Sequence, residues 1–350
     1  MWKTPRSLFH RDTFWPCSVN VTDRESQRLE EEVFNSEEAL KVDIPADLHG
    51  VRLDAAAAHL FPDFSRSRLA EWIKAGRLQR NHQASRPKDK VAVDDQLLLW
   101  PETEDRVEWA PEPLPLDILY EDEHVIVLNK PGGLVVHPAT GHQTGTLVNG
   151  LLAHAPEMSA LPRGGIVHRL DKDTSGVMLA ARSAIAHKSL VAQLADRSVS
   201  RIYSAVCRGT FTGGGTIDAP IGRHPTSRLK MAVVEDGKPS RTHYRIEKRF
   251  NAHTHLSVSL ETGRTHQIRV HLAWRKHPLV GDPVYAGRAM RPAGASDQLV
   301  AALTGFRRQA LHARQLTFLH PQSQESMTFE TPIPADMAEL LACLEQEDAV

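Results

Sequence analysis

A loop rich in ionisable side chains is the first candidate for chemistry in this sequence. Residues 165–176 read GIVHRLDKDTSG and place four charged side chains within positions 169–173. The apolar run 177–181 follows and is typical of a buried strand. Reactive side chains often lie in loops held by a rigid scaffold, which favours an active-site loop built around a carboxylate. Asp, Thr and Ser also favour turns and caps, so a capped turn without chemistry fits this stretch equally well.

A second charged cluster, residues 260–271, reads LETGRTHQIRVH and is predicted to form a strand. The pleat would place Arg264, His266 and Ile268 on one face and Arg269 on the other. Gly263 suggests a bend where the backbone approaches another group closely. A guanidinium can bind a carboxylate through two hydrogen bonds and keep it ionised. The alternative is a charged edge strand that prevents aggregation.

Other chemistries lack their sequence patterns. The chain has 19 histidines, yet His266 and His271 would face opposite sides of the predicted strand. His253 and His255 share a face but have no further ligand at suitable spacing, and no H-E-x-x-H occurs, so we expect no metal site. A Gly-x-Ser-x-Gly elbow, a phosphate-binding loop and a dinucleotide fingerprint are also absent from the sequence.

The composition is that of a soluble globular protein of about two domains, with 350 residues, 41% hydrophobic and 24% charged. Cys17, Cys207 and Cys343 lie far apart without a C-x-x-C pair, which fits a reducing cytoplasm. No apolar run approaches the roughly 20 residues that cross a bilayer, and the N-terminus lacks a signal-peptide core. We therefore expect a cytoplasmic protein that does not associate with a membrane.

The net charge of −1 conceals strong segregation of charge. Residues 65–90 carry eight Lys or Arg against two acids, whereas residues 101–125 carry nine acids against one Arg. A polyanion such as RNA would meet the basic segment and be repelled elsewhere. The alternative is a solvated helix face. The candidate RNA contacts in this segment are Arg66, Arg68, Lys74, Arg77 and Arg80.

Composition and periodicity divide the chain into five parts. Residues 1–44 are predicted to be an acidic, disordered extension, 101–116 an acidic, Pro-rich linker and 341–350 an acidic tail. Residues 45–100 are predicted to form two helices and two strands. Residues 117–340 are predicted to be mostly β, with helices at 147–154 and 184–196 and strands at 124–128, 177–181, 202–207, 241–245, 256–260 and 266–271.

Five segments in order resemble the RluA family of pseudouridine synthases. They are residues 168–176, 201–205, 261–269, 281–285 and 308–313, and the similarity extends over about residues 45–340. The resemblance implies an α+β protein. A small N-terminal alpha-L RNA-binding domain would precede a catalytic domain built on a mixed, largely antiparallel β-sheet flanked by helices.

The resemblance also implies a reaction and roles for residues. The family isomerises uridine in RNA to pseudouridine without cofactor or metal. By resemblance, Asp171 is the catalytic carboxylate, Tyr203 stacks on the uracil, and Arg169 fills the gap left when the target base is flipped out. We expect Arg264 to be the arginine that keeps Asp171 ionised.

Further segments, including 120–138 and 237–245, are similar to family members that modify large-subunit (23S) ribosomal RNA. We therefore expect this RNA or the assembling large subunit as partner, and a monomeric enzyme. A tRNA pseudouridine synthase, a non-catalytic assembly factor of the same fold and a hydrolase releasing uracil are the alternatives. Intact Asp171, Tyr203 and Arg264 disfavour a purely binding role, and a hydrolase would need a second carboxylate to activate water.

Overall fold

The computed structural model divides into two compact units, residues 1–106 and 107–350. It describes residues 39–62, 64, 66–101, 109–138, 144–227, 230–287 and 291–349. Most of the predicted N-terminal extension (1–38) and part of the predicted linker (102–108) lie outside the described residues.

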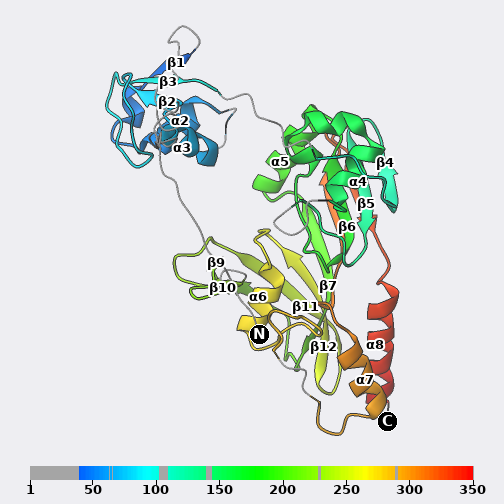
Figure 1. Ribbon diagram of the computed structural model, residues 1–350. Helices are drawn as coiled ribbons and strands as arrows, with labels where there is room; N and C mark the ends of the chain where they lie inside the picture. The colour runs from blue at the N-terminus through cyan, green and yellow to red at the C-terminus, as the bar shows by residue number, and fades with distance from the viewer. Residues whose placement is uncertain are drawn as a thin grey trace, which may run out of the picture. The chain divides into compact units, whose positions relative to one another are not determined.

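The first unit packs two helices on a three-stranded antiparallel sheet of order β1-β3-β2 (Figure 1). Its elements are β1 (Leu40–Asp43), the 3-10 turn η2 (Ala46–Leu48), α2 (Leu53–Leu60), α3 (Arg66–Lys74), β2 (Leu78–Arg80) and β3 (Gln96–Leu99). The two helices and the two strands predicted in this segment are confirmed. The predicted boundary at residue 45 is wrong, because β1 pairs with β3 and Ile44 is buried in the core.

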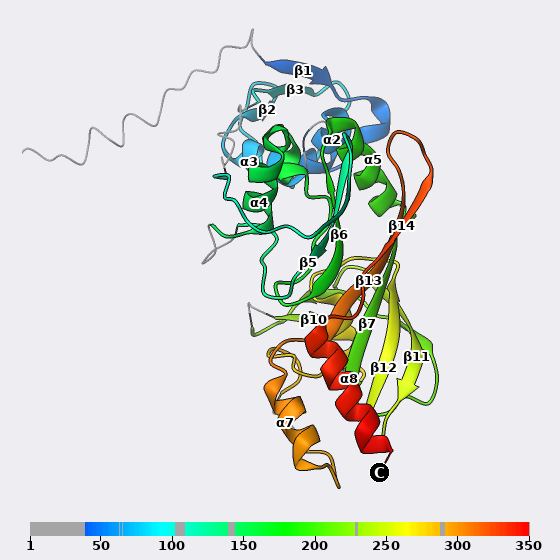
Figure 2. The same ribbon diagram turned by 90° about the vertical axis from the view of Figure 1, so that its right-hand side faces the viewer.

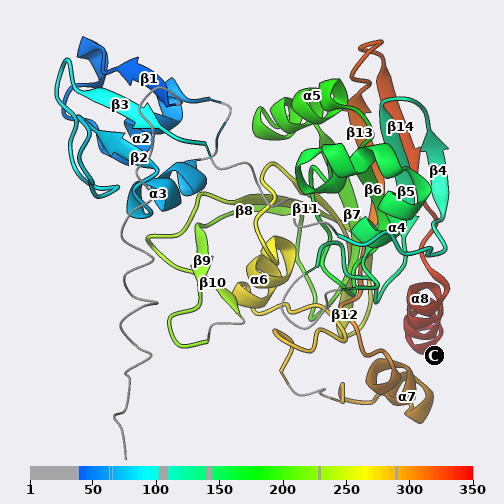
Figure 3. The ribbon, with the colours of Figure 1, turned by 45° about the horizontal axis from the view of Figure 1, so that its top comes forward.

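The second unit is built on one sheet of nine strands. These are β4 (Ile118–Glu121), β5 (Val125–Lys130), β6 (Ser175–Ala181), β7 (Ser200–Arg208), β8 (Gly215–Asp218), β11 (Arg241–Arg249), β12 (His253–Leu260), β13 (Leu311–Leu319) and β14 (Ser326–Glu330). The order is β4-β5-β6-β13-β7-β12-β11-β8, with β14 beside β13 (Figures 2 and 3). β6 and β13 pair in parallel and the other pairs are antiparallel. The predicted α+β class with a mixed, largely antiparallel sheet is confirmed.

Helices and a small second sheet flank this large sheet. They are α4 (Leu147–His154), the 3-10 turns η3 (Pro156–Ala160) and η4 (Pro162–Gly165), α5 (Ala184–Ala195), α6 (Gln267–Trp274), α7 (Asp297–Gly305), α8 (Ala335–Asp348) and the pair β9 (Ile221–Arg223) and β10 (Met231–Val233). α5 packs beside β6, and α6 lies between β10 and β11 (Figure 3). No helix in the described ranges is both long enough and apolar enough to cross a membrane.

Three expectations about the second unit are wrong. Residues 266–271 belong mainly to helix α6 rather than to a strand. Residues 267–272 are all buried. Their sequence therefore shows no alternation of buried and exposed positions that would distinguish a helix from a strand. The acidic tail continues α8, whose Leu340 and Leu344 lie in the core. The last part of the predicted linker packs on the unit, where Leu114 contacts Gly150 and Leu116 reaches the main hydrophobic cluster.

Candidate active site

The loop that carries Asp171 is fixed to the central strands on its C-terminal side. The Thr174 amide donates to the Asp171 carbonyl at 3.0 Å and closes a turn. Gln309 donates to the Thr174 hydroxyl at 3.0 Å just before β13. Gly176 has φ +116°, and a Cβ there would collide with the Ala313 carbonyl, so only glycine fits where β6 meets β13.

A buried lysine holds the same loop from the other side. The Lys130 side chain at the end of β5 is fully buried, and its Nζ donates to the carbonyls of Pro131, Leu134 and Lys172 at 2.8–2.9 Å. Burial lowers the pKa of Lys130 to about 7, against the nearby negative charges of Asp173 and Asp171. Three carbonyl acceptors use all three protons of the ammonium form, so Lys130 ties the loop before β6 to the end of β5.

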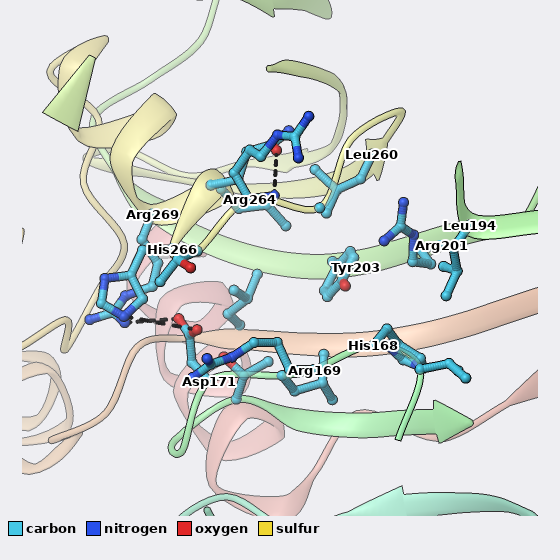
Figure 4. Close-up of a pocket in the computed structure, with 18 of the residues that line it drawn as sticks. His168, Arg169, Asp171, Leu194, Arg201, Tyr203, Leu260, Arg264, His266 and Arg269 are labelled. Atoms are coloured by element: carbon cyan, nitrogen blue, oxygen red, sulfur yellow. Dashed lines mark hydrogen bonds and ion pairs between the residues drawn. The ribbon is translucent and has the colours of Figure 1, made fainter. Parts of the chain in front are cut away.

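Asp171 lines a cavity of about 320 Å³ between this loop, β7 and the turn that begins α6 (Figure 4). Its side chain is 16% exposed, so the carboxylate is reachable from solvent but mostly surrounded by protein. Tyr203 on β7 is 7% exposed and lines the same cavity. The structure therefore brings together two of the predicted catalytic residues, which are 32 positions apart in the chain.

The ion-pair partner of Asp171 is Arg269, not Arg264. Arg269 donates from Nη1 to Asp171 Oδ2 at 2.8 Å, and its side chain is 5% exposed. The rest of the guanidinium binds Asp282, with Nε to Oδ2 at 2.7 Å and Nη2 to Oδ1 at 3.0 Å. Asp282 also accepts the amides of Val284 and Tyr285. This chain of contacts fixes the orientation of the Asp171 carboxylate.

Arg264 is exposed and donates weakly to the Pro239 carbonyl at 3.5 Å. Helix α6 explains why Arg269, and not Arg264, reaches Asp171. On a strand, residues 264 and 269 would have faced opposite sides, but α6 begins after His266 and turns Arg269 inward. The Gln267 side chain closes the preceding turn by accepting from the Arg264 amide and the Thr262 hydroxyl. Arg264 still lines the rim of the cavity.

The ionisable groups next to Asp171 affect one another's pKa. Burial alone would raise the pKa of Asp282, but the hydrogen bonds and charge of Arg269 outweigh it and hold that pKa below its usual range. Burial alone would lower the pKa of Arg269. The hydrogen bonds and charges of Asp282 and Asp171 outweigh burial, so the pKa is raised and the guanidinium stays charged. His266 lies 3.9 Å from Asp171 Oδ1, and burial lowers its pKa, so at neutral pH this imidazole is uncharged.

Tyr203 presents a neutral ring to the cavity. Burial raises the pKa of its phenol, with the negative charge of Asp171 adding to the effect and the positive charge of Arg201 opposing it. The phenol is therefore protonated at neutral pH and offers a flat aromatic surface beside the carboxylate. An aromatic ring in this position can stack on a nucleobase.

The predicted RNA contacts lie in different surroundings. Arg169 is exposed and lines the cavity two residues from Asp171. In the first unit, Arg66 pairs with Asp54 at 3.0 Å and Arg80 with Asp95 at 3.5 Å, so part of that positive charge is balanced by acids distant in sequence. The Arg68 guanidinium lies over the Trp72 ring at 4.6 Å. Lys74 is exposed and Arg77 half-buried.

The residues that the sequence did not single out are Arg269, Asp282 and Lys130. Arg269 was visible as the second arginine of the 264–269 cluster, but a strand period gave no reason to prefer it. Asp282 lies between Gly281 and Pro283, where turn formation is the ordinary interpretation of the pattern. Lys130 follows the apolar run 125–128, and a lysine ending a buried strand before Pro131 was the available signal.

Within the described ranges, no group of three or more His, Cys, Asp or Glu side chains is arranged to hold a metal ion. The site is instead rich in arginine. Five line the cavity (Arg163, Arg169, Arg201, Arg264 and Arg269), and Asp171 is the single carboxylate among the lining residues. A cavity with this charge suits a polyanionic substrate.

Comparison with known proteins agrees with this geometry. Residues 124–274 match the family model for RNA pseudouridylate synthase. The chain is 56% identical over 305 residues to a Pseudomonas aeruginosa protein named ribosomal large subunit pseudouridine synthase D, covering 87% of this chain and 95% of that protein. An Escherichia coli protein of the same name is 52% identical over 293 residues, covering 83% and 90%.

A solved structure named human RNA pseudouridylate synthase domain containing 4 is similar over 65% of this chain and 92% of its own, with a TM-score of 0.52 and 26% identity. A half-buried carboxylate bound by an arginine beside an aromatic ring, in an arginine-lined cavity, fits the chemistry of enzymes that modify a base in RNA. The chain belongs to the RluA family of RNA pseudouridine synthases, isomerases that convert uridine in RNA to pseudouridine.

Proposed function

We propose that this enzyme converts specific uridines of large-subunit (23S) ribosomal RNA to pseudouridine, with Asp171 as the reactive carboxylate. The observation that carries the proposal is the placement of Asp171 in an arginine-lined cavity, bound to Arg269 and beside Tyr203. The names of the relatives, which specify the ribosomal large subunit, support the choice of RNA. We further propose that the enzyme binds RNA in the cytoplasm as a monomer and needs no cofactor.

The reaction breaks the bond between uracil N1 and ribose C1′ and forms one between C5 and C1′. Both a covalent route through the sugar and an elimination route begin from an ionised carboxylate. Arg269 donates a hydrogen bond to Asp171 Oδ2 at 2.8 Å and holds the carboxylate in place for that step. The detached uracil turns over while stacked on Tyr203. The proton on C5 is then lost, and N1 gains one.

The target uridine must leave its stack before it can reach Asp171, at a cost of a few kcal/mol. Arg169 is exposed at the mouth of the cavity, two residues from Asp171. There it would fill the space vacated by the flipped base. Arg264 at the rim would contact the RNA rather than hold the carboxylate, a role that its exposure allows.

The first unit would supply further phosphate contacts. Lys74 is exposed at the end of α3, whereas Arg66 and Arg80 each face a carboxylate. If Lys74 binds one phosphate, Lys74→Gln should lower the slope of log affinity against log salt by about 0.7–0.9. An unchanged slope would remove Lys74 from the RNA interface.

The test of function is carbodiimide mapping of pseudouridine in total ribosomal and transfer RNA from cells with and without the gene. The expected result is loss of signal at defined large-subunit positions, restored by the wild type but not by Asp171→Asn. Loss confined to tRNA would assign a tRNA enzyme. Unchanged pseudouridine everywhere, with defective large subunits, would favour a non-catalytic assembly factor.

A further inference from the structure

Arg201 is a buried arginine for which the described residues offer no ion-pair partner. It lies on β7 and is 8% exposed. Its Nε is buried and makes no hydrogen bond within the described part of the chain. A buried charge normally has a hydrogen-bonded counter-ion, because leaving it unpaired costs several kcal/mol. The other buried arginine of the cavity, Arg269, has two carboxylates.

The guanidinium of Arg201 faces the same cavity as the catalytic groups. Arg201 and Tyr203 are two positions apart on β7, so their side chains leave the same face about 7 Å apart. In the view of Figure 4, Tyr203 lies between Asp171 and Arg201. Both charges lie close enough to act on the pKa of Tyr203, which Arg201 lowers and Asp171 raises.

Two apolar side chains and a glycine line the cavity together with Arg201. Leu194 and Leu260 line the cavity with it, and neither side chain can accept a hydrogen bond. A Cβ at Gly263 would stand 2.7 Å from Arg201 Nη1, so the missing side chain leaves room for the guanidinium. The neighbouring His168 is uncharged, since burial lowers its pKa to about 3 and the charge of Arg201 acts in the same direction.

We propose that Arg201 binds a phosphate group next to the flipped uridine and thereby positions its base on Tyr203. A nucleotide whose base lies on Tyr203 carries a phosphate on each side of its ribose, and a guanidinium one strand repeat away can reach it. Guanidinium and phosphate match as a pair of parallel hydrogen bonds. The bound RNA then supplies the anion that the described residues lack. This inference rests on the proposed function of the site.

The first experiment compares Arg201→Gln and Arg201→Lys with the wild type. The substrate is the RNA stem-loop that mapping identifies. A hydrogen bond to a charged group is worth about 1.5–3 kcal/mol, so Arg201→Gln should weaken binding about 10- to 100-fold. The slope of log affinity against log salt should fall by about 0.7–0.9. Arg201→Lys should keep the slope, because it keeps the charge.

The matched control is Arg314→Gln. Arg314 lies on β13, pairs with Glu247 at 3.0 Å and is outside the cavity, so its replacement should change neither affinity nor slope. Kinetically, Arg201→Gln should raise KM with little change in kcat, as expected for a contact present before and during the reaction. A lower kcat at unchanged KM and unchanged salt slope would overturn the phosphate assignment, since it would place Arg201 on the reacting ring.

A second experiment uses the wild-type enzyme and therefore does not depend on the folding of a variant. The phosphodiester on the 5′ or the 3′ side of the target uridine is replaced by a neutral methylphosphonate. One of the two replacements should weaken binding about 10- to 100-fold, and the same replacement should cost Arg201→Gln little more. Equal effects in wild type and variant would refute the contact. If wild-type enzyme forms no pseudouridine in the unmodified RNA, the proposed function itself fails.

Discussion

Removal of Arg269 should destabilise the second unit strongly, because two carboxylates lose their shared partner. Asp282 has a fully buried side chain, and Arg269 donates two hydrogen bonds to it and one to Asp171. Breaking a buried ion pair by deleting one partner costs about 3–5 kcal/mol. Asp282 keeps the amides of Val284 and Tyr285, which places Arg269→Gln at the lower end of that range.

The assay is thermal unfolding of Arg269→Gln followed by circular dichroism. A loss of about 3 kcal/mol lowers Tm by about 6–12 °C for a domain of this size. The control is Arg264→Gln, which removes a single 3.5 Å hydrogen bond of an exposed side chain and should change stability by less than about 0.5 kcal/mol. The double variant Arg269→Gln with Asp282→Asn should recover part of the stability, since it removes the buried unpaired charge.

The loss of stability caused by Arg269→Gln should also depend on pH and become smaller as pH falls. In the wild type the pKa of Asp282 is held below its usual range, so its stabilisation is present above pH about 4 and is lost at lower pH. In Arg269→Gln, burial without the arginine raises that pKa, and protonation relieves the penalty as pH falls. The difference from wild type should therefore narrow between pH about 7 and about 4.5. A difference that is constant with pH, or equal destabilisation in Arg269→Gln and Arg264→Gln, would refute this account.

Three further outcomes follow from the site. Asp171→Asn should abolish pseudouridine formation while RNA affinity changes less than about threefold, because the substitution removes a charge and little surface; retained turnover would exclude Asp171 as the reactive group. Gly176→Ala should prevent stable folding, because its Cβ would meet the Ala313 carbonyl at a φ of +116°, and a wild-type Tm would contradict the geometry. His168 accepts the Leu179 amide on Nε2, and burial lowers its pKa to about 3 from an unfolded value near 6.5. The unfolded chain therefore binds the proton first, and wild-type stability should fall below pH about 6.5 by up to about 1.4 kcal/mol per pH unit. His168→Gln should flatten this acid limb in urea titrations between pH about 4 and about 7, and an unchanged limb would place the proton uptake elsewhere.

Local patterns were sufficient for most elements of the fold. Helix α4 was predicted with its observed bounds, Leu147–His154, and the buried strands β6 and β7 were located within two residues at each end. β6 is a short apolar run that follows turn residues and is buried along its whole length, so the run itself predicts a core strand. The loop that carries Asp171 was singled out because its charged residues adjoin such a strand, and the structure places Asp171 in a cavity.

The sequence alone determined the family resemblance and the α+β class, and it singled out the loop that carries Asp171 as a candidate. Tertiary structure decided which arginine meets Asp171. Residues 267–272 are buried on every side, so their pattern has no solvent face to distinguish a helix from a strand. The choice came from distant contacts, such as Gln267 with Thr262 and Arg269 with Asp282. Likewise, the charge of Arg66 is balanced by Asp54, because folding pairs residues that a sequence window separates.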